Sequence, residues 1–528
     1  MARQRSALGV FLGVVAAYVL VWGLVAVDRA WRKPVRLDTL KPAYYHDEFV
    51  DIRLRARDRD LVRRWREGLP PKVAVYRDGA LVTTIAAIDW LDLSFSPAEG
   101  AFLARWPCPW NAPSGRYDLV LAGAAELGDR LTVSGFRIQR RVPKALPPGF
   151  VALTLETKQS LASMMVTAPD GTEKGWRGIL DWAEYLEADA FWMLVGETPG
   201  AKPGEVWRSE NLALIPAVAQ ECRKRGLALG VYAMNYLTTS QAALPRYEYA
   251  WDVEEGRPLR TRAISLRDPQ RPRDVAALLG RFADIPGVEY LGLDYIRNAL
   301  GGYELVDDFF AEMPGIRPPP EWSSYSRAER MIWFHHKKVM RKDSRFIDAW
   351  QWWRAHRVGA IVRKLRAALG PEKTLWAFTL TWERGWQHGQ DPVMMNDAGV
   401  DADALMLYEA DGPQFESILK AFDGYARPSD VQLVVGDVVD WPLHQRSPLG
   451  PGEMRRRLDA AIDRIYGGGG PPAGLFVHDA GRALWGRLGP ATTRQWMDAA
   501  RASIRRLRER SGGARGAPGR PGPGRRSP

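Results

Sequence analysis

Carboxylates, amides and aromatic side chains recur in this chain at the points where short apolar runs end. The run Val288–Leu293, for example, passes directly into Asp294, Tyr295 and Arg297. A buried parallel strand shows this pattern where it carries a carboxylate to the mouth of a barrel. Carboxylates and amides can hydrogen-bond sugar hydroxyls, and Trp and Tyr rings can stack on sugars, so the set predicts a carbohydrate site. The predicted substrate-binding residues at these ends are Glu156, Glu197, Asn235, Tyr236, Tyr295, Arg297, Trp382, Glu383, His388, Tyr408, Asp437, His478 and Asp479.

Two catalytic roles follow from the chemistry of glycoside hydrolysis, which needs two carboxylates beside the scissile bond, one of them protonated. Asp294 ends a wholly apolar strand and is the predicted nucleophile, held by neighbours such as Arg297. Glu409 follows the apolar run Ala404–Tyr408 and is the predicted acid/base, with Asp411 as the alternative. A single aspartate at a strand end is often a helix cap or part of a loop ion pair, so the prediction depends on the whole set.

The elements that would position these residues are eight apolar segments alternating with amphipathic helical segments, the pattern of a parallel α/β sheet. The predicted strands are Phe150–Leu155, Ala190–Val195, Ala228–Met234, Tyr290–Leu293, Leu375–Leu380, Ala404–Tyr408, Val431–Val435 and Gly474–Val477. The predicted helices include Ile215–Arg225, Val275–Phe282, Val358–Leu369 and Met454–Ile465. Residues 150–500 are therefore predicted to form an α/β fold, a (β/α)8 TIM barrel. A doubly wound open sheet is the alternative, because crossover handedness favours closure without requiring it.

A long insertion at about residues 299–350 separates the fourth and fifth predicted strands. It is rich in tryptophan, which fits either a lid over a polymer-binding cleft or a helical addition that packs its own aromatic side chains. The cluster Trp350–Trp353 leads into a predicted helix, so burial in a core is the favoured interpretation for it.

Residues 8–27 are apolar and uncharged, and they match the length of one bilayer crossing. No convincing cleavage site precedes Asp28, so after a short tail (residues 1–7) an uncleaved transmembrane signal anchor is expected. Basic residues flank both sides of this segment, and their count leans slightly against an exported body. The domain types nevertheless favour a single-pass membrane protein whose body lies on the periplasmic or extracellular side.

Residues 38–142 show short alternating strands separated by turns and predict an all-β, immunoglobulin-like sandwich. Asp78-Gly79 marks a hairpin turn, and Trp110–Leu119 resembles a turn-into-strand of immunoglobulin-like modules. The domain fits a carbohydrate-binding module or a spacer above the membrane, and the spacer is favoured. A Pro-rich linker (residues 143–149) leads into the barrel, and residues 511–528 form an Arg/Gly/Pro tail expected to be disordered.

The net charge of +12 arises at the two ends of the chain, residues 1–37 and 505–528, while residues 38–504 are formally neutral. The body therefore lacks the basic footprint of a nucleic-acid-binding protein, and no nucleic-acid partner is expected. Cys108 and Cys222 are too few for a disulfide scaffold and are expected to be buried free thiols. The spaced histidine pairs of zinc enzymes and the nucleophile elbow are missing from the sequence, so neither metal nor cofactor is expected.

Two stretches resemble a known family. Leu291–Arg297 is similar to the "hydrophobic-Asp-Tyr-Ile-Arg" strand of glycosyl-hydrolase-like barrel proteins, which are allied to the α-galactosidase and α-amylase type barrels. Gln390–Asp401, followed by the run to Tyr408, is similar to that family's "Gln-Asp … Gly-x-x-Asp" approach to its sixth strand. The resemblance spans roughly residues 150–485 and implies a nucleophile on strand four, at Asp294, and an acid/base on or after strand six. The sequence departs from the family's usual residues at Asn298-Ala299 and at Tyr408–Ala410.

The sequence thus predicts a membrane-anchored glycoside hydrolase that acts on an extracellular or cell-wall polysaccharide by a retaining mechanism. The alternative is a catalytically inactive barrel that binds glycan as a structural or assembly factor of the cell envelope. Carboxyl groups about 5–6 Å apart would favour the retaining mechanism, and a separation of about 6.5–9.5 Å an inverting one.

Overall fold

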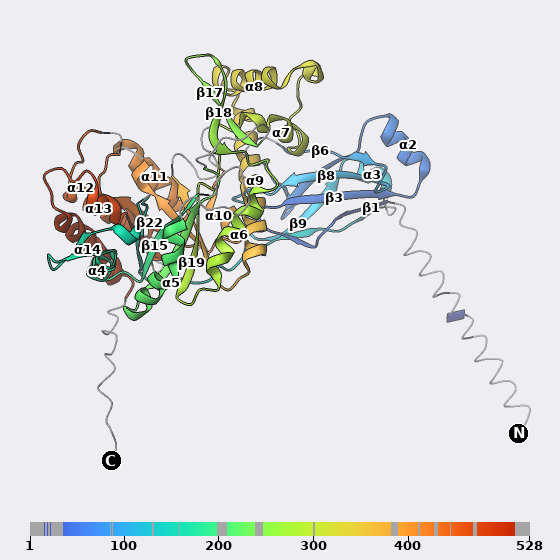
Figure 1. Cartoon of the computed structure of the whole chain (residues 1–528). Coiled ribbons are helices and arrows are strands. Elements are labelled where there is room, and N and C mark those ends of the chain that lie inside the picture. Colours follow the sequence, from blue (N-terminus) through green and yellow to red (C-terminus); the bar gives the residue numbers. More distant parts are fainter. Residues whose placement is uncertain are drawn as a thin grey trace, which may run out of the picture. The chain divides into compact units, whose positions relative to one another are not determined.

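A computed structural model describes the chain from residue 35 to residue 512, together with the isolated positions 15, 18, 19 and 22 (Figure 1). Within that range the gaps are residues 85, 87, 129–130, 158, 198–208, 238–245, 299–300, 382–388, 410–411, 427–430, 444 and 468–471. The chain divides into two compact units, Met1–Tyr44 with Phe49–Gln139, and Tyr45–Glu48 with Arg140–Pro528.

The predicted membrane anchor, residues 8–27, lies outside the described residues except at its four isolated positions. Among the helices that the structure does describe, none combines the length and apolar character that a membrane crossing requires. The anchor therefore stays a prediction, and so does the tail, because residues 513–528 are also outside the described range.

The first unit contains two β-sheets, with strand orders β10-β1-β3-β8-β7 and β2-β11-β9-β4-β5, and β6 pairs with β4. Its strands are β1 (Val35–Thr39), β2 (Ala43–Tyr44), β3 (Phe49–Ala56), β4 (Lys72–Arg77), β5 (Ala80–Leu81), β6 (Leu91–Asp92), β7 (Ser94–Ser96), β8 (Ala101–Pro107), β9 (Gly115–Leu121), β10 (Leu131–Val133) and β11 (Phe136–Ile138). Two short helices, α2 (Arg59–Glu67) and α3 (Ala124–Leu127), lie in its connections.

Aromatic side chains from both sheets meet inside this unit, where the ring centroid of Trp106 on β8 lies 6.1 Å from that of Phe136 on β11. The β4–β5 hairpin turns at Asp78 and Gly79, which have φ values of 50° and 78°, as a tight hairpin turn requires. Tyr117 donates a hydrogen bond of 2.6 Å to the carbonyl of Pro113, four residues upstream, in the manner of a tyrosine corner. The immunoglobulin-like assignment itself stays a prediction.

The second unit is built on a closed barrel of eight parallel strands, which confirms the predicted fold and excludes the open sheet because the eighth strand pairs with the first. The strands in barrel order are β12 (Phe150–Leu155), β15 (Ala190–Glu197), β16 (Ala228–Met234), β19 (Val288–Asp294), β20 (Thr374–Leu380), β21 (Ala402–Met406), β22 (Leu433–Val438) and β23 (Gly474–His478). Each overlaps a strand predicted from the sequence.

Helices connect these strands, and additional short elements are inserted at several points. The helices are α4 (Arg177–Tyr185), α5 (Ser209–Lys224), α6 (Arg271–Ala283), α7 (Val306–Glu312), α8 (Arg327–His335), α9 (Ser344–Leu369), α10 (Pro392–Ala398), α11 (Gly412–Ala426), α12 (Pro451–Ile465), α13 (Ala480–Trp485) and α14 (Thr493–Arg510). The inserted hairpins are β13 (Val166–Thr167) with β14 (Glu173–Lys174), and β17 (Tyr247–Asp252) with β18 (Arg257–Ile264). Short helical turns are η2 (Leu161–Ser163), η3 (Tyr303–Leu305), η4 (Pro320–Ser324), η5 (His336–Met340) and η7 (Leu407–Glu409).

The lower part of the barrel is filled by aromatic side chains. The indoles of Trp192 and Trp376 stack at 3.9 Å between centroids. Glycines on neighbouring strands make this possible, since a Cβ at Gly230 would lie 2.2 Å from Trp192, and one at Gly292 would lie 2.4 Å from Trp376. These rings form a solid floor, so the space available to a ligand lies above them, at the carboxyl ends of the strands.

The insertions that follow strands β16 and β19 pack together, with β17 and β18 beside α7 and α8 (Figure 1). The ring of Trp251 on β17 stacks on His335 of α8 at 3.7 Å. Trp350 and Trp353 are fully buried, and Trp350 packs against Phe334 at 4.5 Å, which confirms the core interpretation of this tryptophan cluster. The predicted helix Val358–Leu369 is the second half of the longer helix α9.

Candidate active site

Strand geometry decides which predicted residues face the barrel interior, because side chains two positions apart share a face. Ala152, Tyr290 and Phe476 belong to the barrel core. Continuing in steps of two from these residues, the interior face receives Thr154, Glu156, Gly292, Asp294 and His478. The structure therefore brings the ends of the first, fourth and eighth strands to one mouth.

Tyr232, on β16, also faces the barrel interior, where its ring packs against those of Trp376 and Phe378. Its hydroxyl oxygen is buried and has no hydrogen-bond partner among the described residues. Burial raises the pKa of Tyr232 well above its usual value, and the negative charges of Glu156, Asp479 and Asp294 raise it further. Three carboxylates from three strand ends thus act on one hydroxyl group.

His478 connects two of these carboxylates. Its Nε2 atom lies 3.6 Å from Oε2 of Glu156 and 3.7 Å from Oδ2 of Asp479. The two carboxylate oxygens are therefore at most about 7 Å apart. The ring of Tyr408 stacks on that of His478 at 5.0 Å and 2°, and Oγ1 of Thr154 lies 3.0 Å from its Nδ1. Burial, helped by the charge of Arg482, lowers the pKa of His478 to about 3, so the ring is neutral at neutral pH.

Asp479 is a carboxylate of the mouth whose pKa is raised to near neutral pH. It is the N-cap of α13 and accepts a hydrogen bond of 2.8 Å from the backbone N–H of Arg482. Burial raises its pKa to about 7, the negative charge of Glu156 adds to the increase, and Arg482 opposes it. Arg482 is itself held by Asp440, 3.1 Å from its Nη1. A carboxyl that is half protonated near neutral pH can serve as a general acid.

Asp294 is almost fully buried at the end of β19, and its Oδ1 accepts a hydrogen bond of 2.8 Å from the backbone N–H of Tyr295. Asn235 fixes the strand end, since both its backbone N–H and its side-chain amide donate to the carbonyl of Asp294, at 2.8 and 2.9 Å. Arg297, expected to hold the Asp294 carboxylate, instead lies 4.9 Å from the ring of Tyr295 and donates to the carbonyl of Asn298 at 3.0 Å. It makes no ion pair with Asp294 within the described part of the chain.

Asp437 has a different position from the one predicted, because its side chain falls on the outer face of β22. Its Oδ2 lies 2.8 Å from Nε of Arg457 on α12, and its Oδ1 accepts from the N–H of Val438. The guanidinium of Arg457 is enclosed by Phe415 and Trp441, at 4.2 and 4.0 Å. Both carboxylate oxygens are thus engaged in attaching a helix to the barrel, and a substrate would have to share them.

Tyr236 is also buried, and its hydroxyl has no hydrogen-bond partner among the residues that the structure describes. The structure does not describe the side chains of the other predicted site residues. Trp382, Glu383, His388 and Asp411 lie outside the described residues, and for Glu197 and Glu409 only the backbone is described. The pairing of Asp294 with Glu409 or Asp411 therefore stays a prediction.

Tyr232 was absent from the residues predicted for the site. It occupies the middle of the predicted strand Ala228–Met234, where an aromatic residue indicates core packing. Tyr232 and Met234 are two positions apart, so the strand pattern could have predicted that both side chains face the barrel interior. It could not have predicted the three carboxylates whose charges act on the tyrosine hydroxyl.

The stretch Gln390–Asp401, which carries part of the family resemblance, has a structural role. The Gln390 side chain accepts from the N–H of Leu380 at 3.0 Å and donates to the carbonyl of Phe378 at 2.8 Å, which closes the end of β20. Asp401 accepts from Nη1 of Arg141 and from the N–H of Leu375, both at 2.9 Å. This stretch therefore fixes both ends of β20, with Gln390 at its carboxyl end and Asp401 near its amino end.

No family model matches the chain, and no curated protein is similar to it in sequence. Solved structures with a related arrangement include a β-galactosidase from the psychrophilic Marinomonas ef1 (TM-score 0.41, 12% identity, 69% of this chain and 60% of that one). Others are an exo-β-1,4-mannosidase from Opitutaceae bacterium strain TAV5 (0.33, 12%, 69% and 61%) and a polyextremophilic β-galactosidase from the Antarctic haloarchaeon Halorubrum lacusprofundi (0.40, 12%, 69% and 58%). The chain covers less than two thirds of each of these glycoside hydrolases, and a likeness of this degree carries no conclusion about its chemistry.

Proposed function

We propose that this protein is a glycoside hydrolase that acts on a polysaccharide. The observation that carries the proposal is that Glu156 and Asp479 both approach Nε2 of His478 at the carboxyl ends of the barrel strands, where the buried Asp294 ends another strand on the same interior face. A closed aromatic floor lies below these groups, and the stacked rings of Tyr408 and His478 lie beside them.

In the proposed reaction, Asp294 attacks the anomeric carbon as a carboxylate while a protonated carboxyl gives its proton to the glycosidic oxygen. The leaving alcohol departs, and a glycosyl ester of Asp294 remains. Water then attacks the anomeric carbon, the acid residue takes back a proton, and the Asp294 carboxylate is released, so the stereochemistry is retained. Asp479 joins Glu409 and Asp411 as a candidate for the acid, because its pKa of about 7 keeps a protonated fraction at neutral pH.

The location of the protein in the cell is also a proposal. The apolar run at residues 8–27 supports a single-pass anchor with the body on the periplasmic or extracellular side, where a cell-wall or extracellular polysaccharide would be the substrate. The second candidate function is an inactive, glycan-binding barrel of the cell envelope. The use of Asp479 as the cap of α13 favours it, since that carboxylate also has a structural task.

The test is hydrolysis of a panel of polysaccharides by the wild-type chain and by Asp294→Asn. We expect the substitution to lower kcat by at least about a thousandfold while glycan binding persists, because it removes the attacking carboxylate and preserves shape. Asp403→Asn is the matched control, since Asp403 is equally buried on a barrel strand but outside the mouth. It should retain full activity.

Equal hydrolysis by the wild type and Asp294→Asn would contradict the proposed role of Asp294. Binding of a glycan by the wild type with no hydrolysis of any panel member would favour the inactive barrel instead.

A further inference from the structure

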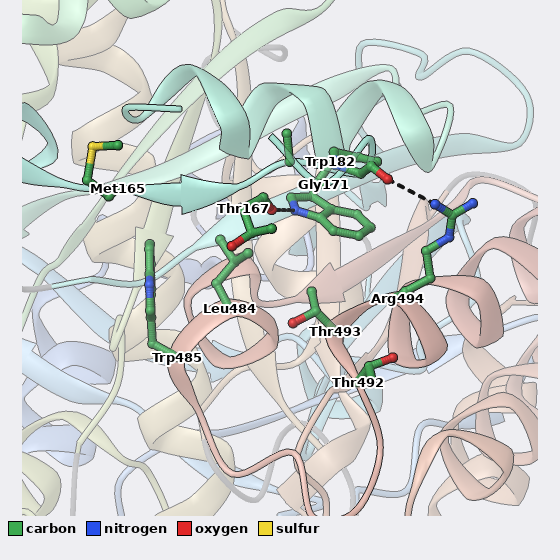
Figure 2. A pocket seen from close by; sticks show the side chains of 11 residues that line it. Met165, Thr167, Gly171, Trp182, Leu484, Trp485, Thr492, Thr493 and Arg494 are labelled. Atoms are coloured by element: carbon green, nitrogen blue, oxygen red, sulfur yellow. Dashed lines mark hydrogen bonds between the residues drawn. The ribbon is translucent and has the colours of Figure 1, made fainter. Parts of the chain in front are cut away.

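A hollow opens between the β13–β14 hairpin and the junction of α13 with α14 (Figure 2). Its volume is about 450 Å³, which is large enough to hold a sugar ring. The residues that matter for its chemistry are Met165, Thr167, Trp182, Trp485, Thr493 and Arg494.

The lining combines an exposed aromatic platform with polar groups. Met165 is 59% exposed and Trp485 is 42% exposed, and Figure 2 shows both at the same end of the hollow, with Arg494 at the other. Thr493 donates its hydroxyl proton to the carbonyl of Ala483 at 2.7 Å, which leaves the oxygen able to accept.

Arg494 donates from Nη1 to the carbonyl of Pro169 at 2.9 Å, and its guanidinium lies 4.8 Å from the ring of Tyr185. These contacts fix the direction of the guanidinium, and an arginine has five N–H donors, so further donors are available. An indole face beside fixed donors and acceptors suits a pyranose ring, which offers an apolar face and a rim of hydroxyl groups.

The two walls of the hollow continue the two loops that carry active-site carboxylates. The β13–β14 hairpin follows β12 and Glu156, and α13 begins at its cap Asp479 and ends at Trp485. The six residues from the cap Asp479 to Trp485 advance by about 9 Å along the helix axis, so Trp485 lies about that distance along the helix from the cap.

We propose that this hollow is an outlying subsite for a linear polysaccharide, in which Trp485 stacks on a sugar ring several positions from the scissile bond. This inference rests on the proposed function and extends it. It identifies the substrate as a long polymer, and it predicts that long polymers use a binding contact that short glycosides do not reach.

The test compares Trp485→Ala and Trp485→Tyr with the wild-type chain on a polymer cleaved in the panel and on a short aryl glycoside of the same sugar. We expect Trp485→Ala to raise KM for the polymer about tenfold, with kcat and the constants for the aryl glycoside unchanged, because only the polymer reaches Trp485. Trp485→Tyr should recover most of the loss, since it restores an aromatic face. Trp90→Ala is the matched control, because Trp90 is 40% exposed in the first unit.

Unchanged polymer KM in Trp485→Ala, or an equal change for both substrates, would overturn the subsite while leaving the hydrolase proposal intact. If the wild type hydrolyses nothing, the hydrolase proposal fails, and equilibrium binding of the same polymers then decides the subsite. Binding that is lost in Trp485→Ala supports it, and the absence of binding to the wild type, or equal binding by both, overturns it.

Discussion

Asp403 gives a prediction whose magnitude can be worked out from the structure. It lies on β21 between Ala402 and Ala404, which face the barrel core, so its own side chain points to the outer face under the helices. It is 1% exposed, and the hydroxyl of Thr379 donates to its Oδ1 at 3.0 Å. Burial raises the pKa of Asp403 from 3.8 to about 8, and the nearby charge of Asp391 adds to this effect. The folded protein therefore holds the carboxyl group protonated at neutral pH.

The sign of the effect on stability follows from linkage. Below about pH 4 the carboxyl is protonated in both the folded and the unfolded chain, so its ionisation does not affect the free energy of unfolding. As the pH rises from about 4 to about 8, only the unfolded chain ionises, so the free energy of unfolding falls. Each pKa unit is worth about 1.4 kcal/mol, so the loss is on the order of 4 kcal/mol by pH 7.

Asp403→Asn should remove this loss, because an amide matches the protonated carboxyl in shape and still accepts from Thr379. The measurement is urea unfolding of the wild-type and variant chains at several pH values between about 4 and 8. We expect the variant's advantage in unfolding free energy to be near zero at the acid end and to grow with pH. The difference between the two chains isolates Asp403 from other titrating groups.

Glu416→Gln, an exposed change on α11, serves as the control for the loss of one acidic side chain. A constant difference between the wild type and Asp403→Asn over this pH range would refute the reasoning. It would mean that Asp403 ionises in the folded protein as readily as in water.

Three further predictions concern the mouth and the barrel wall. If Asp479 is the acid, kcat/KM should fall as the pH rises through about 7, the pKa that burial gives it, and Asp479→Asn should remove this limb from the pH profile. Arg457→Met should lower the free energy of unfolding by about 3–5 kcal/mol in urea titrations, because it leaves Asp437 buried without its cation, and adding Asp437→Asn should recover part of the loss. Gly292→Ala should cost about 1–3 kcal/mol in the same assay, since the new Cβ would lie 2.4 Å from the ring of Trp376, whereas Gly280→Ala meets no atom within 4 Å and should not.

The agreement between predicted and observed strand bounds differs from strand to strand, and the differences have physical reasons. The predicted strand Ala228–Met234 matches β16 at both ends, because a continuous apolar run indicates a strand that is buried on both faces. The sixth strand was predicted at Ala404–Tyr408, but β21 spans Ala402–Met406, so the prediction lay too far along the chain. Tyr408 belongs instead to the short turn η7, since the apolar run continues past the last ladder hydrogen bond and its length does not reveal where pairing stops.

For the residues of the mouth, too, some features could be predicted from the sequence and others could not. That Asp294 would end a barrel strand was readable from the chain, because strand polarity and apolar patterning are local properties. That Asp437 would bind Arg457, and that Arg297 would turn to Tyr295, was not, because these depend on partners brought close by the fold.

By itself, then, the sequence determined the eight strands, their parallel arrangement and the line of polar residues at their ends, all through the two-residue and helical periods of local backbone geometry. Only the tertiary structure decided which of those residues share the barrel interior. Closure of the barrel places Glu156 and Asp479, which are more than three hundred residues apart, near the same nitrogen of one histidine. The burial that results is what raises the pKa of Asp479, and burial is a property of the whole fold, not of any segment.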